Sequence, residues 1–189
     1  MLCSYLKDIA RDGSLLPNVI EIQTTIEQAW DNGICAYGRI ESGGLRGTRK
    51  WIGTHDAVAY FTQIGVTTQA SSFKEEDDGS PAVLSLLDFI EAYFLSGADE
   101  AKVKGTSHIT KLAPVYFQRA GHSMTIVGLE RREDGHRNLL VFDPSFGTSD
   151  SMNRMLDRRG QRALPQTLLR PYRRSDESLS RWDEFEVMM

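Results

Sequence analysis

The sequence predicts an α+β domain in which helices come early in the chain and strands come late. Apolar residues recur at helical spacing before residue 96, whereas short apolar runs bounded by turn residues follow from residue 114. Helices and strands do not alternate, so the parallel sheet of an α/β fold is not expected. The expected arrangement is a set of N-terminal helices packed on a C-terminal antiparallel sheet.

Four segments are predicted to be helices because their apolar residues fall on one helical face. Breaker pairs such as Asp12-Gly13 and Asn32-Gly33 end the first two, and Gly65 ends the third. The glycine-rich residues that follow the second helix, to about Thr48, are expected to form a loop. The predicted helices are Met1 to Ile9, a second that opens at Pro17, a third around Trp51 to Phe61 with Thr54 as its N-cap, and Val83 to Leu95.

The predicted strands are short runs of apolar or alternating residues. Two of them flank the polar turn from Arg131 to Arg137, and we expect them to pair as a β-hairpin. The predicted strands are Val66 to Thr68, Pro114 to Gln118, the hairpin strands Met124 to Leu129 and Asn138 to Phe142, and an edge strand at Phe185 to Val187.

Length and composition indicate one domain, residues 1–189, with a core from 1 to 150 and an arginine-rich extension from 151 to 189. Between Ser151 and Arg181 the extension holds eight arginines against three acidic residues, and a solvated basic helix is its simplest interpretation. The net charge of −4 and the absence of interleaved aromatic residues argue against a nucleic-acid partner. Two cysteines and no apolar run of membrane-spanning length predict a soluble protein of the cytoplasm, the nucleus or both, with no membrane partner.

One histidine of the four, His122, follows a glycine at the start of a predicted hairpin strand. Asp143 comes twenty-one residues later, at the end of the partner strand, and is followed by Pro144. An antiparallel hairpin brings the start of one strand beside the end of the other. An imidazole and a carboxylate are therefore expected to meet, with Asp143 fixing the tautomer and the orientation of His122.

Spacing alone leaves plainer interpretations of this pair open. Gly-His-Ser is also a common turn, and Asp-Pro is a common end to a strand. A metal site is not expected, because neither cysteine and no other histidine stands at ligand spacing from His122.

Further motifs surround the pair in a fixed order along residues 1 to 150. They are IEQAW at 26–30, LRGTRKWIG at 45–53, PVYFQ at 114–118, GHSMTIVG at 121–128 and NLLVFDP at 138–144. Together they resemble the papain-like cysteine peptidases that process ubiquitin-fold modifiers. That family includes the modifier-specific proteases and the zinc-finger-bearing, ZUFSP-like polyubiquitin peptidases. Ser145 follows Pro144, where the modifier-specific proteases have a histidine, so the ZUFSP-like and fungal members match more closely.

The resemblance implies a papain-like fold and a Cys-His-Asp triad to which His122 and Asp143 contribute two members. It also implies ubiquitin or a ubiquitin-like modifier, with its conjugates, as the partner, and no cofactor. Gln118 and Trp51 are candidates for lining the substrate cleft, although a buried packing role is the simpler interpretation of Trp51.

The family's nucleophilic cysteine is missing from its expected position. In relatives it lies in a Gly-Cys-Gly-Tyr-Arg-Asn motif at a helix N-terminus, and Met1 to Leu6 resembles the continuation of that helix. Cys3 is interpreted as a small core residue and Cys35 as part of the loop after the second helix, so neither is expected to be the nucleophile. Two explanations of this start are expected: a gene model that begins at an internal methionine, which we favour, or a real short form that is catalytically inactive.

Two functions follow from these observations. The first is thiol-dependent removal of ubiquitin or a ubiquitin-like modifier, a deubiquitinase- or deufmylase-type hydrolysis for which only His122 and Asp143 of the triad are present. The second is a catalytically inactive module that binds the modifier. The arginine-rich extension is expected to support contacts with an acidic surface in either case.

Overall fold

The computed structural model describes residues 16–75, 79–104, 107–157 and 166–189, and the helix predicted from Met1 to Ile9 lies outside them. Helices and antiparallel strand pairs make up the described chain, which confirms the α+β class. The residues cluster into two compact units. Unit 1 comprises Met1–Ser72, Val115–Gln118 and Glu186–Met189, and unit 2 comprises Phe73–Pro114 and Arg119–Phe185.

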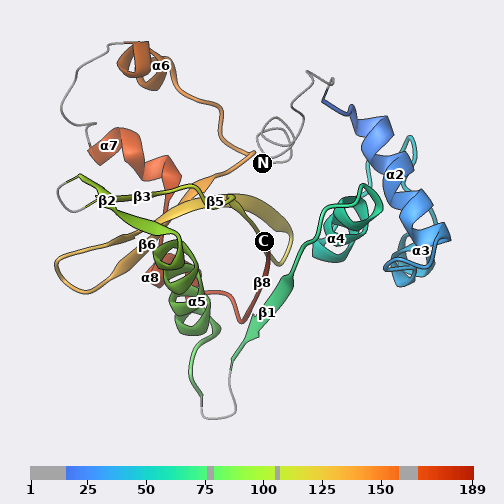
Figure 1. Ribbon diagram of the computed structural model, residues 1–189, viewed down its shortest axis with the longest axis horizontal. Coiled ribbons are helices and arrows are strands. Elements are labelled where there is room, and N and C mark those ends of the chain that lie inside the picture. The colour runs from blue at the N-terminus through green and yellow to red at the C-terminus, as the bar shows by residue number, and fades with distance from the viewer. Residues whose placement is uncertain (1–15, 76–78, 105–106, 158–165) are drawn as a thin grey trace. The chain divides into compact units, whose positions relative to one another are not determined.

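Two helices of unit 1, α2 (Val19–Asp31) and α4 (Thr54–Gln63), pack against each other (Figure 1). A capping box starts α2: the Asn18 amide donates to Glu21 at 2.7 Å, and the Glu21 amide donates to Asn18 at 3.0 Å. The helix ends before Asn32, and Gly33 follows in the left-handed region at φ 84°, as the breaker pair predicts. A short helix, α3 (Tyr37–Ser42), occupies part of the segment that was predicted to be a loop.

The N-cap of α4 lies one residue before the predicted N-cap, Thr54. Gly53 is the N-cap, and its amide donates to the Asp56 carboxylate at 2.8 Å, while Thr54 is the first helical residue. This capping interaction begins the helix after Trp51 and Ile52, so those two side chains are not part of its apolar face.

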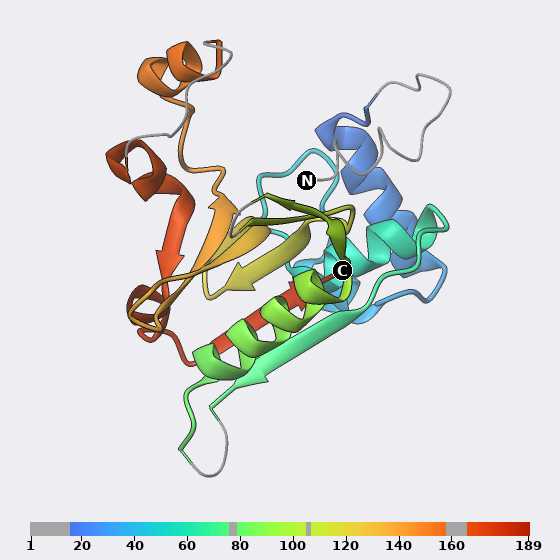
Figure 2. The ribbon, with the colours of Figure 1, turned by 60° about the vertical axis from the view of Figure 1, so that its left-hand side comes forward.

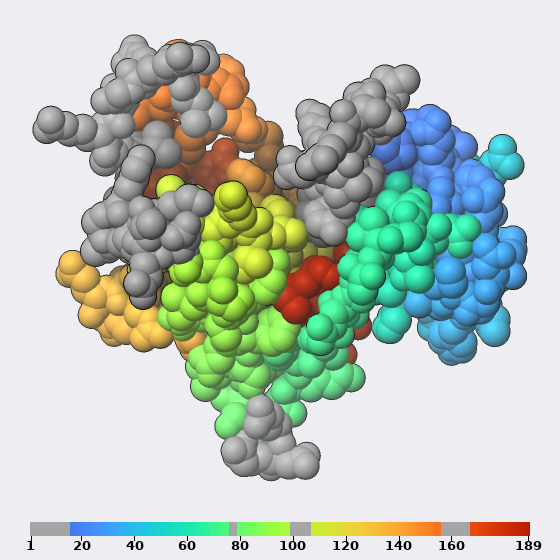
Figure 3. Space-filling model, viewed as in Figure 1, coloured from blue at the N-terminus to red at the C-terminus, as the bar shows by residue number. Residues whose placement is uncertain are grey.

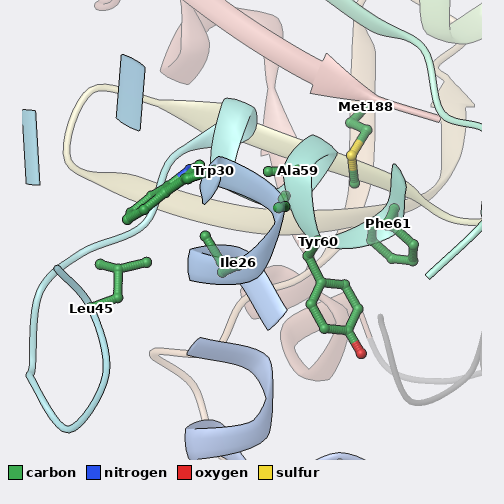
Figure 4. Packing of buried hydrophobic residues seen from close by; sticks show 9 residues of the cluster. Ile26, Trp30, Leu45, Ala59, Tyr60, Phe61 and Met188 are labelled. Carbon is green, nitrogen blue, oxygen red and sulfur yellow. The ribbon is translucent and has the colours of Figure 1, made fainter. Parts of the chain in front are cut away.

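The helices of unit 1 enclose an apolar core (Figure 4). Ile26 and Ala29 of α2 and Ala59 of α4 are fully buried, in agreement with the helical spacing of apolar residues in the sequence. Tyr60 and Phe61 meet edge to face, with ring centroids 5.6 Å apart. Burying one large apolar side chain stabilises a fold by about 1.5–3 kcal/mol, so this cluster contributes to the stability of unit 1.

The strand residues of unit 1 come from three distant parts of the chain. They belong to β1 (Ala70–Lys74), β8 (Glu184–Met188) and β4 (Val115–Arg119), which follow one another in the order β1-β8-β4. The strand predicted at Val66 to Thr68 is wrong, because the first strand begins only at Ala70. The prediction of an edge strand at Phe185 to Val187 is also wrong, since β8 has a neighbour on each side.

Unit 2 is built on a β-hairpin covered by a long helix. The hairpin strands are β5 (His122–Arg131) and β6 (Arg137–Phe142), and β7 (Arg173–Ser175) pairs antiparallel with β6 (Figure 2). Helix α5 (Ala82–Ser96) packs against β5. The predicted helix and the predicted hairpin are thus confirmed, and the hairpin buries alternate residues, Met124 and Ile126 on β5 and Leu139 and Val141 on β6.

Other elements of unit 2 were missed or misassigned. The hairpin of β2 (Ala98–Lys104) and β3 (Ser107–Thr110) was missed, because its sequence is polar and lacks the apolar alternation that predicts strands. Beyond α6 (Asp150–Asp157), the extension forms α7 (Gln166–Leu169), the 3₁₀ turn η1 (Arg170–Tyr172), β7 and α8 (Asp176–Leu179). The interpretation as a solvated basic helix is wrong at Arg173 and Arg174, which lie in β7. Arg158, Arg159 and Arg162 fall outside the described residues.

None of the helices in the described part of the chain combines the length and the apolar character that a membrane span requires.

Candidate functional site

The register of the hairpin places His122 and Asp143 on one face of the sheet. Thr125 lies opposite Phe142, so His122 precedes this pair by three residues and Asp143 follows it by one. Continuing the ladder makes the two residues diagonal neighbours, and such neighbours share a face. The same face carries the buried Val141, two residues before Asp143. The pair therefore stands at the end of the apolar core, where alternation has already turned both side chains inward.

The imidazole and the carboxylate meet, as the hairpin argument predicts. His122 Nε2 lies 2.8 Å from Asp143 Oδ1, and the two side chains are 17% and 5% exposed. An ionised carboxylate only accepts hydrogen bonds, so this contact assigns the proton of the neutral ring to Nε2. The other nitrogen, Nδ1, then carries a lone pair and is the atom of the ring that can act as a base.

Three donors hold the Asp143 carboxylate. Besides His122, the Ser145 amide donates to Oδ1 at 2.9 Å, and Arg174 Nη2 donates to Oδ2 at 2.5 Å. Burial alone would raise the pKa of Asp143, but the hydrogen bonds from Ser145, Arg174 and His122 outweigh it and lower the pKa below its ordinary value. Asp143 is therefore an anion at neutral pH, and its charge faces the ring of His122.

Arg174 reaches this site from β7 and was not singled out in the sequence. Its Nη1 donates to the carbonyl oxygens of Pro171 and Arg173, each at 2.9 Å, and its guanidinium lies 5.7 Å from the ring centre of Phe146. No local signal separates Arg174 from the other arginines of the extension. Arg174 reaches Asp143 because β7 pairs with β6.

A pocket of about 590 Å³ opens beside the pair. One of its arginines, Arg119, stacks over the Trp182 ring at 4.1 Å. His122 is part of the pocket wall, where cationic side chains outnumber the single carboxylate. Besides His122 and Asp143, the lining residues are Arg119, Ser145, Phe146, Arg170, Pro171 and Arg174.

The two residues proposed to line a cleft, Gln118 and Trp51, belong to unit 1. Gln118 Oε1 accepts a hydrogen bond from the Tyr116 hydroxyl at 2.7 Å and lies 3.4 Å from the Thr54 hydroxyl. Trp51 is 85% exposed, so its interpretation as a buried packing residue is wrong. The reason is the helix start at Gly53, which leaves Trp51 in the preceding loop. A cleft role for either residue stays a prediction.

Cys35 is a free thiol in the turn after α2, and Cys3 lies outside the described residues. The backbone of Cys35 is left-handed, at φ 49°. Burial, together with the negative charge of Asp56, raises the pKa of the Cys35 thiol. A raised pKa favours the neutral thiol over the reactive thiolate, which argues against Cys35 as a nucleophile.

A second histidine–carboxylate pair lies at the turn of the hairpin, which projects from the surface of unit 2 (Figure 3). His136 Nδ1 is 2.9 Å from Asp176 Oδ2, and the two side chains are 45% and 21% exposed. Within the described part of the chain, no group of three or more histidine, cysteine or acidic side chains could hold a metal ion.

A largely buried histidine–aspartate pair in the wall of a pocket, on an α+β scaffold, is typical of the hydrolases that use a histidine base. Residues 1–188 match the model of peptidase family C78, and the chain belongs to this family. A likeness to the crystal structure of UfSP from C. elegans covers 99% of this chain and 27% of that one, at 15% identity and a TM-score of 0.50. The chain has the papain-like fold that the sequence predicts.

Curated relatives extend the likeness at the level of sequence. The chain is 34% identical over 134 residues to zinc finger-containing ubiquitin peptidase 1 of Rattus norvegicus, covering 70% of this chain and 22% of the relative. The Bos taurus protein of the same name is 32% identical over 150 residues, or 76% of this chain and 25% of the relative. Ubiquitin carboxyl-terminal hydrolase mug105 of Schizosaccharomyces pombe is 30% identical over 124 residues, or 65% of this chain and 45% of the relative. The chain thus spans a quarter or less of the two mammalian relatives.

Proposed function

We propose that this chain supplies the base and the orienting carboxylate of a cysteine peptidase that removes ubiquitin or a ubiquitin-like modifier from its conjugates. One observation carries the proposal: the 2.8 Å contact between His122 and Asp143, 17% and 5% exposed, beside an open pocket. Membership of peptidase family C78 and the ubiquitin peptidases among the relatives support the choice of substrate.

In the proposed reaction, His122 Nδ1 takes the proton of a cysteine thiol, and the thiolate attacks the carbonyl carbon of the modifier's C-terminal glycine. The imidazolium then gives this proton to the leaving amine, and a thioester remains. Water, deprotonated by the same nitrogen, hydrolyses the thioester and restores the thiol. Asp143 stays ionised throughout and stabilises the positive ring that forms in each step.

A second candidate function is a module that binds the modifier without hydrolysing it. The Cys35 thiol favours this alternative, because burial and Asp56 raise its pKa and oppose formation of a thiolate. In this form of the proposal, the pocket beside His122 contributes to recognition and no bond is broken.

Ubiquitin and ubiquitin-like modifiers that carry a C-terminal electrophile test both candidates. The 189-residue chain is incubated with each probe, labelled cysteines are identified by mass spectrometry, and affinity is measured with the unmodified modifier. Labelling at Cys3 or Cys35 that His122→Ala abolishes supports the peptidase and overturns our interpretation of both cysteines, whereas affinity without labelling supports the binding module. A chain that neither binds nor reacts with any modifier contradicts both candidates.

A further inference from the structure

We propose that Arg174 is a positioning residue, which locks the Asp143 carboxylate in the orientation that holds His122. The inference deepens the proposed function and rests on it for the consequence in turnover. The contact between Arg174 and Asp143 is present without a substrate, so it can be tested independently of turnover.

The two oxygens of Asp143 have different partners. Oδ1 accepts from His122 and from the Ser145 amide, whereas Oδ2 accepts from Arg174. The terminal torsion of an aspartate is soft, so a carboxylate held at one oxygen can turn about its Cβ–Cγ bond. The Arg174 contact at the second oxygen removes this rotation. Oδ1 is thereby kept in line with His122 Nε2.

Contacts other than the one with Asp143 also hold the Arg174 side chain in place. Its backbone lies opposite Leu139 in the β6–β7 ladder, on the face that also carries Asp143. Its Nη1 is held by two backbone carbonyls, and 18% of the side chain is exposed. A planar guanidinium can serve these carbonyls and the carboxylate at the same time, whereas a lysine ammonium presents its donors from one point. The position therefore requires arginine rather than positive charge alone.

The adjacent Arg173 provides a matched control on the same strand. It lies opposite Leu140, so its side chain leaves the other face of the sheet. It is also 18% exposed, and it forms a fork with Glu130 through hydrogen bonds of 2.7 and 2.5 Å. Substituting Arg173 removes a comparable ion pair without changing the partners of Asp143.

The test compares Arg174→Met, Arg174→Lys and Arg173→Met in the full chain by NMR. Two quantities are followed: the titration of the Asp143 side-chain carbon and the solvent exchange of the His122 Nε2 proton. In Arg174→Met, we expect the pKa of Asp143 to rise toward its ordinary value and the Nε2 proton to exchange about tenfold faster or more, since a charge-assisted hydrogen bond is lost. In Arg173→Met, both quantities stay at their wild-type values.

Arg174→Lys separates charge from geometry. We expect it to keep part of the effect on the Asp143 titration, because the positive charge remains, but to show the faster proton exchange. If Arg174→Met does not fold, faster exchange in the lysine variant decides for the proposal, and wild-type exchange in that variant decides against it. Wild-type values of both quantities in Arg174→Met, or equal changes in Arg173→Met, also overturn the proposal.

These readouts separate the proposal from the proposed function. Altered NMR signals in Arg174→Met, together with an absence of labelling by any modifier, would keep Arg174 as a positioning residue and remove the peptidase assignment. Where labelling occurs, Arg174→Met should slow it about tenfold or more, and Arg173→Met should leave its rate at the wild-type value. If Arg174→Met is labelled at the wild-type rate, Arg174 is not a positioning residue, and the peptidase assignment is unaffected.

Discussion

Unit 2 holds two histidine–aspartate pairs that have nearly the same contact distance and different surroundings. His122 and Asp143 are 2.8 Å apart, and His136 and Asp176 are 2.9 Å apart. The first pair is 17% and 5% exposed, whereas the second is 45% and 21% exposed. In the first pair, the carboxylate also binds Arg174, whose side chain is 18% exposed. A short contact therefore does not define a site by itself.

The nitrogen that makes each contact differs as well. His122 uses Nε2, the far nitrogen of the ring, whereas His136 uses Nδ1 at the surface of the hairpin turn. Asp176 also accepts hydrogen bonds from the backbone amides of Arg137 and Glu177, so the exposed pair ties the hairpin turn to the start of α8. We interpret the exposed pair as a structural link and the buried pair as the candidate site.

The largest expected difference between the pairs is in reactivity toward a modifier. If the chain reacts with an electrophilic modifier, His122→Ala should lower the rate by as much as about a millionfold, because the nucleophile loses its base. His136→Ala should react at the wild-type rate. Time courses of labelling followed by mass spectrometry measure both. Equal loss in the two variants would remove the distinction between the pairs.

The next largest difference is in stability. Asp143→Ala leaves Arg174 and His122 without their shared acceptor, and we expect a loss of about 2–4 kcal/mol in the free energy of unfolding. Asp176→Ala should cost less, because water screens its exposed partner. Urea unfolding at neutral pH measures both losses. A larger loss for Asp176→Ala would contradict the assignment of the buried pair as the stronger interaction.

A smaller effect is expected from acid. The pKa of Asp143 is lowered in the folded protein by hydrogen bonds from Ser145, Arg174 and His122, which outweigh burial. Its contribution to stability is therefore present above the ordinary value of 3.8 and is lost as the pH falls through the lower folded value. The difference in unfolding free energy between wild type and Asp143→Asn should shrink below pH 3.8. A constant difference across that range would show that the folded carboxyl titrates normally.

The smallest effect is expected from His136, and it has the opposite sign. Asp176 raises the pKa of His136 above its ordinary value of 6.5, first through their hydrogen bond and then through its charge. The contribution of this pair is therefore fully present below pH 6.5 and is lost as the pH rises through the raised folded value. Thermal unfolding of wild type and His136→Ala at pH 5.5 and pH 8.5 should show the larger gap at the lower pH. A gap that grows with pH would contradict the ion pair.

Local sequence patterns were sufficient to predict the contact between His122 and Asp143, but not the contribution of Arg174. The breaker-free apolar run of α5 and the alternation of β5 and β6 are properties of short segments, and so is the meeting of His122 with Asp143 across one hairpin. The helix start at Gly53 was misplaced by one residue because Thr54 is the more common kind of N-cap.

The position of Arg174 and the neighbours of β8 depend on pairing between distant strands, which no local sequence pattern predicts. Arg174 is 31 residues from Asp143, and it reaches the carboxylate only because β7 pairs with β6. The same holds for β8, whose neighbours β1 and β4 begin at Ala70 and Val115. An apolar run near the end of a chain looks the same whether it pairs on one side or on both.

The place of β8 also has a consequence for synthesis on the ribosome. In unit 1, the strand residues of β1 and β4 have β8 between them, and β8 is made more than a hundred residues after β1. Until residues 186–188 emerge, β1 and β4 each present an unpaired edge, which is a surface prone to association. Helices α2 and α4 can pack early, but their sheet must wait, so the unit that is mostly synthesised first is completed last.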